Sequence, residues 1–397
     1  MSSTKSVLPD NDTVELVFKT LETETTALFG HLDLSFLTDY PVFAPLVRGR
    51  TRVHEPPELL KGVLHCFYND IYGPRPMARE LHNEDVWRQC GFESPPSRRT
   101  LSRFITDFEL VAEGVFIELA HELAEQVLLG KLFRIDGTDI PVDHRDEDAD
   151  WNYGRTEDDY YYGYGCCVVT AAHNIPVAAA FTLAKKVDEE TAMRVTRDAL
   201  AVGTPRWFLG DSEFDMLEWH DWLLEQSVVP ISPYNPRNTD DPPDIEYRVE
   251  ERIKEHSDTV RLWQRQLDET YAERSRVETA IGVCKDLGLG APQVRGRVRV
   301  KSHVFIALCL RLALHLPITT EEMMSPAQPS HYENSSAPPP TSYLQWRATA
   351  ACLDANAIYC DDYAILLWAS SIHSNHFRRP AFVNYPMSWP MSVVPIG

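Results

Sequence analysis

The sequence lacks the features of membrane-bound and secreted proteins. Its longest apolar run, residues 304–316, is broken by Arg311 and His315. It is also shorter than the roughly 20 residues that a membrane-spanning helix needs. The first 13 residues are polar and have no apolar segment behind a basic start, unlike a signal peptide. We therefore expect a cytoplasmic protein with no membrane partner.

Common cofactor patterns are missing as well. There is no G-x-x-x-x-G-K-[ST] loop and no G-x-G-x-x-G after an expected strand, so ATP and dinucleotide sites lose their main support. The eight cysteines include no C-x-x-C pair and lie near no paired histidines at zinc spacing. We expect them to be buried apolar groups rather than zinc ligands.

Lysine is scarce, and basic residues are outnumbered. Only 9 of the 38 basic residues are lysine, and 59 acidic residues give a net charge of −21. This total argues against a general nucleic-acid coat. However, seven basic residues and only two acids lie within residues 274–301: Arg274, Arg276, Lys285, Arg295, Arg297, Arg299 and Lys301, with Glu278 and Asp286. The local sign is reversed there, so the total charge does not argue against a DNA enzyme.

Residues 1–130 are predicted to be helical. Apolar residues recur at helical spacing in residues 59–67 and 108–127. Between these segments, Ser97 is placed to cap a short helix with Arg98, Arg99 and Arg103 on its exposed face. This pattern is compatible with a helix-turn-helix element that reads DNA, and a solvated basic helix is the alternative.

The pattern changes at residue 131. Strands are expected at residues 132–135, 160–172, 176–184, 206–210 and 228–232, with helices at 188–202 and 213–226. This order predicts a mixed α/β sheet flanked by helices. A polar loop or small insertion is expected at 235–258, one long helix at 260–289 and an apolar helix at 304–314.

We therefore predict three regions. Residues 1–130 form a helical N-terminal DNA-binding region, and residues 131–322 form the catalytic domain. Residues 323–397 form a tail rich in proline and tryptophan, with few charges and no clear helical or strand period. We interpret this tail as an appended or out-of-frame segment outside the working fold.

Three carboxylates stand where a metal-dependent nuclease needs them. Asp136 and Asp211 end expected strands, and Glu278 lies on the long helix. Hard cations such as Mg²⁺ bind carboxylate oxygen, and two ions can hold the attacking and leaving oxygens of a phosphoryl transfer. Asp139 and Asp215 are nearby alternatives, but the preceding strands favour Asp136 and Asp211. We interpret the acidic run at residues 143–150 as a solvated loop.

The long helix carries the most specific pattern. At 100° per residue, Tyr271, Arg274, Glu278 and Lys285 fall within a stripe of about 60°. One ion pair at a spacing of four residues would explain only Arg274 and Glu278. Arginine provides a forked phosphate clamp and lysine a point charge, and tyrosine can donate to phosphate or stack on a base.

The spacing Tyr271-x2-Arg274-x3-Glu278-x6-Lys285 resembles the Y-R-E-K signature of the insertion-sequence DDE transposases. The catalytic domain of that family has the RNase H-like fold of the retroviral integrase superfamily. The resemblance extends over about residues 40–320. It is also carried by shorter segments, at residues 57–61, 99–104, 135–138, 161–165, 175–176, 209–211 and 230–237.

The resemblance implies a set of roles. Asp136, Asp211 and Glu278 would bind two Mg²⁺ ions, for which Mn²⁺ can substitute. Tyr271, Arg274 and Lys285 would contact the DNA backbone near the cleaved end. The partners would be double-stranded DNA, as terminal inverted repeats and target DNA, and a second copy of the chain in a homodimer associated with the nucleoid.

Two other functions stay open at this point. One is an RNase H-like nuclease that cleaves DNA without strand transfer. The other is an inactive, DNA-binding remnant of a transposase.

Overall fold

The computed structural model describes residues 29, 32–44, 52–153, 160–183, 187–238, 243–256, 260–290 and 292–316. The predicted tail at 323–397 lies outside these residues. Within the described part of the chain, no helix is long and apolar enough to cross a membrane.

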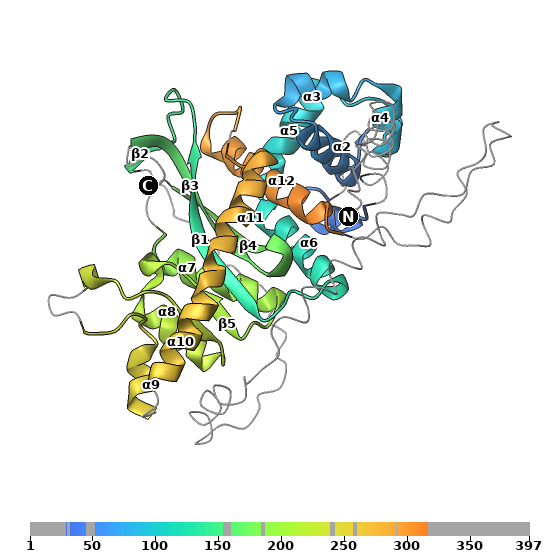
Figure 1. Cartoon of the computed structure of the whole chain (residues 1–397). Helices are drawn as coiled ribbons and strands as arrows, with labels where there is room; N and C mark the ends of the chain where they lie inside the picture. The colour runs from blue at the N-terminus through green and yellow to red at the C-terminus, as the bar shows by residue number, and fades with distance from the viewer. Residues whose placement is uncertain are drawn as a thin grey trace, which may run out of the picture. The chain divides into compact units, whose positions relative to one another are not determined.

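Helices make up the described part of the chain before residue 131 (Figure 1). They are η1 (Ser35–Asp39), α2 (Pro56–Tyr68), α3 (Pro74–Glu80), α4 (Glu84–Gln89), α5 (Arg98–Phe108) and α6 (Ala112–Gln126). Ser97 caps α5 as predicted, because its Oγ accepts a hydrogen bond from the Thr100 amide at 3.2 Å. The apolar face of α5 is buried, and Arg98, Arg99 and Arg103 are exposed on the other face.

A six-stranded mixed sheet follows. Its strands are β1 (Leu132–Pro141), β2 (Asp150–Tyr153), β3 (Tyr160–Thr170), β4 (Pro176–Leu183), β5 (Trp207–Leu209) and β6 (Val229–Ile231). The central strand β1 pairs antiparallel with β3 and parallel with β5. At the edges, β4 pairs antiparallel with β3, and β6 pairs parallel with β5. This is the mixed α/β sheet that the sequence predicted for an RNase H-like domain.

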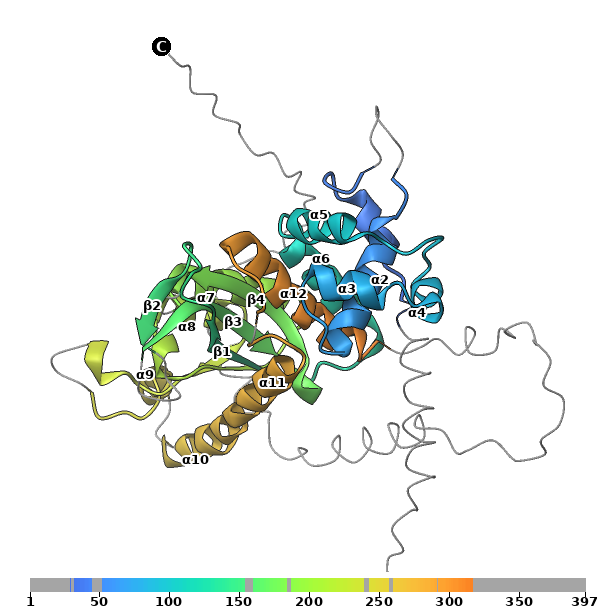
Figure 2. The same cartoon turned by 90° about the horizontal axis from the view of Figure 1, so that it is seen from above.

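Helices flank this sheet. On one face, α7 (Glu189–Val202) packs against β3 and β4, and α8 (Leu217–Glu225) packs against β6. A long helical rod crosses β1 and β3 and consists of α10 (Val260–Tyr271), the 3-10 turn η5 (Ala272–Arg274) and α11 (Ser275–Asp286). Figure 2 shows α10 and α11 in line with each other. The single helix predicted for 260–289 therefore contains a tighter turn at residues 272–274.

Three further elements differ from the prediction. The region expected to be a loop at 235–258 contains the turn η4 (Pro236–Asn238) and helix α9 (Glu250–His256). The last described helix, α12 (Arg297–Ala313), begins seven residues before the predicted apolar helix. It packs against α2, α5 and α6, and Ser302 donates a hydrogen bond to the Ile105 carbonyl at 2.7 Å.

The acidic run at residues 143–150 is not simply a solvated loop. Asp146 is only 1% exposed and accepts hydrogen bonds from the Tyr164 hydroxyl at 3.1 Å and the Gly296 amide at 2.8 Å. Asp148 accepts from the Arg297 amide at 3.0 Å. These carboxylates occupy the amino end of α12, where backbone amides lack partners within the helix. The prediction was wrong for Asp146 because its partners are distant in sequence.

Candidate active site

Asp136 and Asp211 lie at the same level of two neighbouring strands. Asp211 follows the end of β5 as predicted, but Asp136 lies in the middle of β1, so the prediction that a strand ends at Asp136 was wrong. Arg134 pairs with Leu209 in the parallel register of β1 and β5, so the two aspartates each follow this pair by two residues. Asp136 is 5% exposed, and its Oδ1 accepts from the Gly137 amide at 2.8 Å. Asp211 caps the turn η3 (Ser212–Phe214) by accepting from the Glu213 amide at 2.9 Å.

The turn after β5 requires a glycine before Asp211. A Cβ atom at Gly210 would lie 2.6 Å from the Cβ of Phe214, which is closer than carbon atoms can pack. Gly210 therefore lets η3 close tightly over the strand end, and this closure fixes the direction of the Asp211 side chain.

Arg274 joins these aspartates to Glu278. Its Nη2 lies 3.5 Å from Oδ2 of Asp136 and 3.8 Å from Oδ2 of Asp211, and its Nη1 lies 3.0 Å from Oε1 of Glu278. Although burial acts to lower it, the pKa of the Arg274 guanidinium is raised, because Asp136 and the other nearby acidic groups favour the charged form. All three predicted carboxylates therefore surround one guanidinium.

The residues around Arg274 are unequally restrained. The Glu278 side chain is 60% exposed, whereas that of Asp136 is 7% exposed. The Nε of Arg274 is buried and has no hydrogen-bond partner within the described part of the chain. The Arg274 side chain is therefore held by charge more than by a complete set of hydrogen bonds.

Tyr271 lies beside this cluster, at the carboxyl end of α10. Burial raises the pKa of its phenol, Arg274 lowers it, and Asp211 and Asp136 raise it further. The net shift is upward, so the hydroxyl keeps its proton at neutral pH and can donate a hydrogen bond. Lys285 is exposed farther along α11.

The three predicted arginines of α5 belong to a different part of the fold. The helix α5 packs against α2, α3 and α12. Arg98, Arg99 and Arg103 point to solvent from the face opposite this contact. The structure therefore places them on a different part of the fold from the carboxylate cluster.

Carboxylate oxygens are suitable ligands for a hard divalent cation. Among the described residues, no three histidine, cysteine, aspartate or glutamate side chains are gathered closely enough to hold one ion. The positive charge at the centre of Asp136, Asp211 and Glu278 is that of Arg274. The donor chemistry thus fits a divalent cation.

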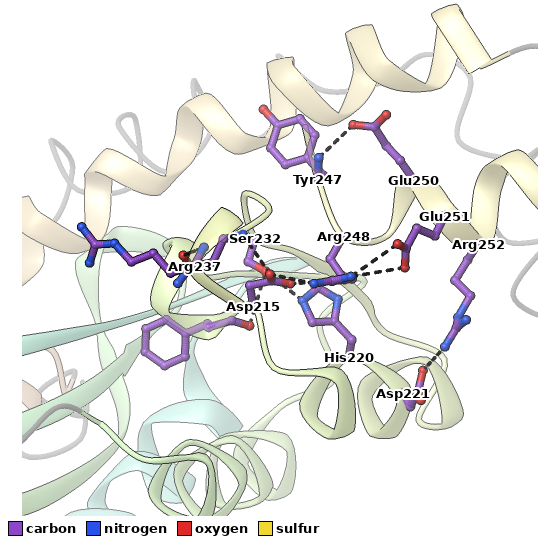
Figure 3. Close-up of polar contacts among 12 residues, drawn as sticks. Asp215, His220, Asp221, Ser232, Arg237, Tyr247, Arg248, Glu250, Glu251 and Arg252 are labelled. Atoms are coloured by element: carbon purple, nitrogen blue, oxygen red, sulfur yellow. Dashed lines mark hydrogen bonds and ion pairs between the residues drawn. The ribbon is translucent and has the colours of Figure 1, made fainter. Parts of the chain in front are cut away.

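The alternative aspartate, Asp215, is fully engaged elsewhere (Figure 3). Its two oxygens accept from Nε and Nη2 of Arg248 at 2.7 and 3.0 Å, and Oδ2 also accepts from the Asn235 amide at 2.8 Å. Its side chain is completely buried. Asp139, the other alternative, lies three residues after Asp136 on β1, where alternation turns it to the opposite face of the sheet.

Sequence reasoning missed one buried residue near this site. Arg134 lies two residues before Asp136 in β1, and its Nε donates to the Glu273 carbonyl at 2.7 Å. The only sequence signal was an arginine at an inward position of an apolar strand. Its partner lies 139 residues away, so local patterns could not reveal the contact.

Comparisons with known proteins identify relatives of this chain. The family model described as "Transposase DDE domain" matches residues 130–313. Probable transposases for insertion sequence element ISH11, from Halobacterium salinarum strains R1 and NRC-1, are each 54% identical to this chain over 309 residues. Each match covers 78% of this chain and 94% of the relative.

A solved structure also aligns with the chain. The Drosophila P element transposase strand transfer complex is 14% identical and covers 76% of this chain and 71% of its own. Its TM-score of 0.28 is too low to support an argument about this structure. The identity and coverage of the Halobacterium relatives, with the matching domain model, show that the chain belongs to the DDE transposases of insertion sequence elements.

Proposed function

We propose that this transposase uses Asp136, Asp211 and Glu278 to bind divalent metal ions, namely two Mg²⁺ ions for which Mn²⁺ can substitute. The protein would nick the 3′ ends of its element and join the freed hydroxyls to target DNA. One observation carries the proposal: the Arg274 guanidinium lies within 4 Å of a carboxylate oxygen from each of the three residues.

The three ligands would differ in how they act. When bound, the metal ions activate water and neutralise charge on the reacting phosphate. Asp136 is fixed by its strand and Asp211 by the turn η3, so these two supply preformed oxygens. Glu278 is exposed on α11 and can complete the set when DNA is present.

The other residues of the stripe would hold the DNA. The forked guanidinium of Arg274 matches two phosphate oxygens, so it can exchange its carboxylate contacts for the scissile phosphate. Tyr271 keeps its proton and would donate a hydrogen bond to a neighbouring phosphate oxygen. Lys285, on the exposed side of α11, would supply a point charge along the backbone.

The DNA partners follow from the same proposal. Terminal inverted repeats and target DNA would bind as duplexes, with Arg98, Arg99 and Arg103 contacting the repeat from the exposed face of α5. Because an element has two ends, a homodimer would place one catalytic site at each end. This complex would form in the cytoplasm, in association with the nucleoid.

Glu278→Ala tests the proposal. We expect this variant to lose Mg²⁺-dependent cleavage of a labelled element end while it retains most of its affinity for that end in a gel-shift titration. Glu269→Ala is the matched control, because Glu269 is an exposed glutamate on the same helical rod, paired with Arg265. It should cleave normally. Equal loss of binding and cleavage by Glu278→Ala argues against the assigned role.

The same assay separates the alternative functions. Cleavage without joining to target DNA would favour a nuclease, and binding without cleavage by the unmodified protein would favour an inactive remnant. Terminal inverted repeats and a short target duplication beside the gene would support transposition.

A further inference from the structure

A buried arginine connects the central strand to the helical rod. The side chain of Arg134 on β1 is 6% exposed. Its Nε donates to the Glu273 carbonyl at 2.7 Å, and its Nη1 donates to the Ala171 carbonyl at 3.4 Å. Its Nη2 lies 3.4 Å from the Glu273 carboxylate. One guanidinium thus connects β1, the end of β3 and the turn η5.

Burial of this charge is unfavourable in itself. Desolvation lowers the pKa of Arg134 to about 10, and the neighbouring Glu273 only partly opposes the shift. A buried ion pair is often no more stabilising than apolar side chains of similar size. The contact is therefore weak as a source of stability, and its value lies in the geometry that it fixes.

That geometry involves the proposed site directly. Side chains alternate along a strand, so Arg134 and Asp136 project from the same face of β1. The carbonyl that Arg134 binds belongs to the peptide immediately before Arg274, within η5. The strand that presents Asp136 therefore also restrains the turn that presents Arg274 and begins the helix of Glu278.

The Glu273 side chain is the weaker part of this connection. Its Oε2 lies 2.8 Å from Nε of Arg276, so the carboxylate is shared between two arginines, and it is about one-third exposed. The main-chain carbonyl has a fixed position and accepts the shorter bond from Arg134. The restraint therefore acts mainly through the backbone.

We propose that Arg134 is a positioning residue, which sets Arg274 and Glu278 against Asp136 and Asp211 through the carbonyl of Glu273. The proposal rests on the roles proposed above for these four residues. Misplacement of a catalytic group by about 1 Å can lower a rate by about 10²-fold, so a small shift of η5 is sufficient for a large effect.

The test compares Arg134→Met, Arg134→Lys and Glu273→Gln. We expect Arg134→Met to lower the single-turnover rate of end cleavage by about 10²-fold, with less than about threefold loss of affinity for the end. Arg134→Lys retains the charge and a single donor nitrogen but not the forked guanidinium, and its cleavage rate should fall between those of Arg134→Met and the unmodified protein. Glu273→Gln keeps the carbonyl and should cleave at nearly the normal rate.

Hydrogen exchange gives a readout that does not depend on activity. In protein without DNA or metal, Arg134→Met should accelerate amide exchange in peptides covering residues 272–278 more than elsewhere, and Glu273→Gln should not. The proposal is overturned if exchange rises uniformly, or if Glu273→Gln reproduces Arg134→Met in both assays. Failure of the proposed function is distinguishable, because it would appear as normal cleavage by Glu278→Ala while the exchange result is unaffected.

Discussion

Asp211 and Asp215 lie four residues apart, on the two sides of η3, yet each contacts a different arginine. Asp211 belongs to the Arg274 cluster, which also contains Asp136 and Glu278. Asp215 belongs to the Arg248 cluster, which also contains Glu251. Each cluster consists of one guanidinium and two or three carboxylates. A comparison of the two therefore shows how distance and burial change the strength of the same kind of interaction.

The Arg248 cluster has nearly complete hydrogen bonding. Asp215 is buried, and its hydrogen bonds are the main reason that the pKa of Arg248 is raised. The guanidinium carbon also lies 4.5 Å from the centre of the Tyr234 ring. By contrast, Arg274 reaches the two aspartates only at 3.5 and 3.8 Å and leaves its Nε without a partner among the described residues. The first arrangement holds a turn in place with short hydrogen bonds, and the second joins its groups at longer distances.

The largest expected effect on stability is that of Arg248→Met. This change leaves the Asp215 carboxylate buried without its partner, and broken buried pairs typically destabilise by about 3–5 kcal/mol. Chemical denaturation monitored by circular dichroism would measure the loss. The double variant with Asp215→Asn should recover part of it. A loss below about 1 kcal/mol for Arg248→Met would contradict the comparison.

Arg274→Met should have a smaller effect that depends on metal. When a chelator removes divalent metal, the variant's three carboxylates have lost the Arg274 guanidinium that they share. We then expect the free energy of unfolding to fall by about 1–3 kcal/mol. Millimolar Mg²⁺ should restore much of this loss by binding to the folded state. Arg248→Met serves as the control and should not respond to Mg²⁺. An equal response of both variants would remove the distinction between the clusters.

Acid should destabilise the fold through His220, which is buried close enough to Asp215 and Arg248 for both charges to act on it. Burial lowers the pKa of this histidine to about 4, and its Nε2 lies 2.8 Å from the Ser232 hydroxyl (Figure 3). The unfolded chain binds a proton near the ordinary value of 6.5, so stability falls as pH drops from about 6.5 to about 4. The slope from one histidine is about 1.4 kcal/mol per pH unit.

Denaturation curves across this pH range would measure that slope. His220→Gln should reduce the slope by the contribution of one histidine, about 1.4 kcal/mol per pH unit. His303 provides a comparison outside the cluster, because burial also lowers its pKa to about 4. An unchanged slope in His220→Gln would show that the histidine does not contribute.

The smallest expected effect is that of Glu251→Ala. This carboxylate lies 3.4 Å from Nη1 of Arg248, and its side chain is 36% exposed. Pairs that are open to solvent contribute about 0–1 kcal/mol. Denaturation should therefore show a loss below about 1 kcal/mol. A loss comparable to that of Arg248→Met would show that Glu251, rather than Asp215, is the main partner of Arg248.

The features that could be predicted from the sequence depend on local patterns. The mixed sheet, most of its strands in their order along the chain, and the Ser97 cap all follow from alternation, helical spacing and capping chemistry. The Y-R-E-K spacing also led to the family, which the relatives show. The roles assigned to Asp136, Asp211 and Glu278 stay predictions, although the structure does bring their side chains around Arg274.

The features that escaped prediction depend on partners far along the chain. Asp146 looked solvated because its partner at Gly296 is 150 residues away. Similarly, Arg248 lies in a polar segment that was expected to be a loop or small insertion. Its ion pair with Asp215, 33 residues earlier, gave no local pattern that could predict it. The strand β2 has only four residues and pairs with β3, so no long alternating run marked it. Such contacts are established by folding and carry no signal of their own in sequence.

The packing of α12 has a consequence for synthesis of the chain. Residues 127–296 separate α6 from α12, yet α12 packs against α2, α5 and α6. Ribosomes add about 5–20 residues per second, so the last helix emerges roughly 10–30 seconds after α6. Until then, the apolar surface that α12 covers stays open. The first helices to be synthesised are therefore among the last to be fully packed. A ribosome stalled before residue 297 would carry a partly folded chain with exposed apolar surface that is prone to aggregate.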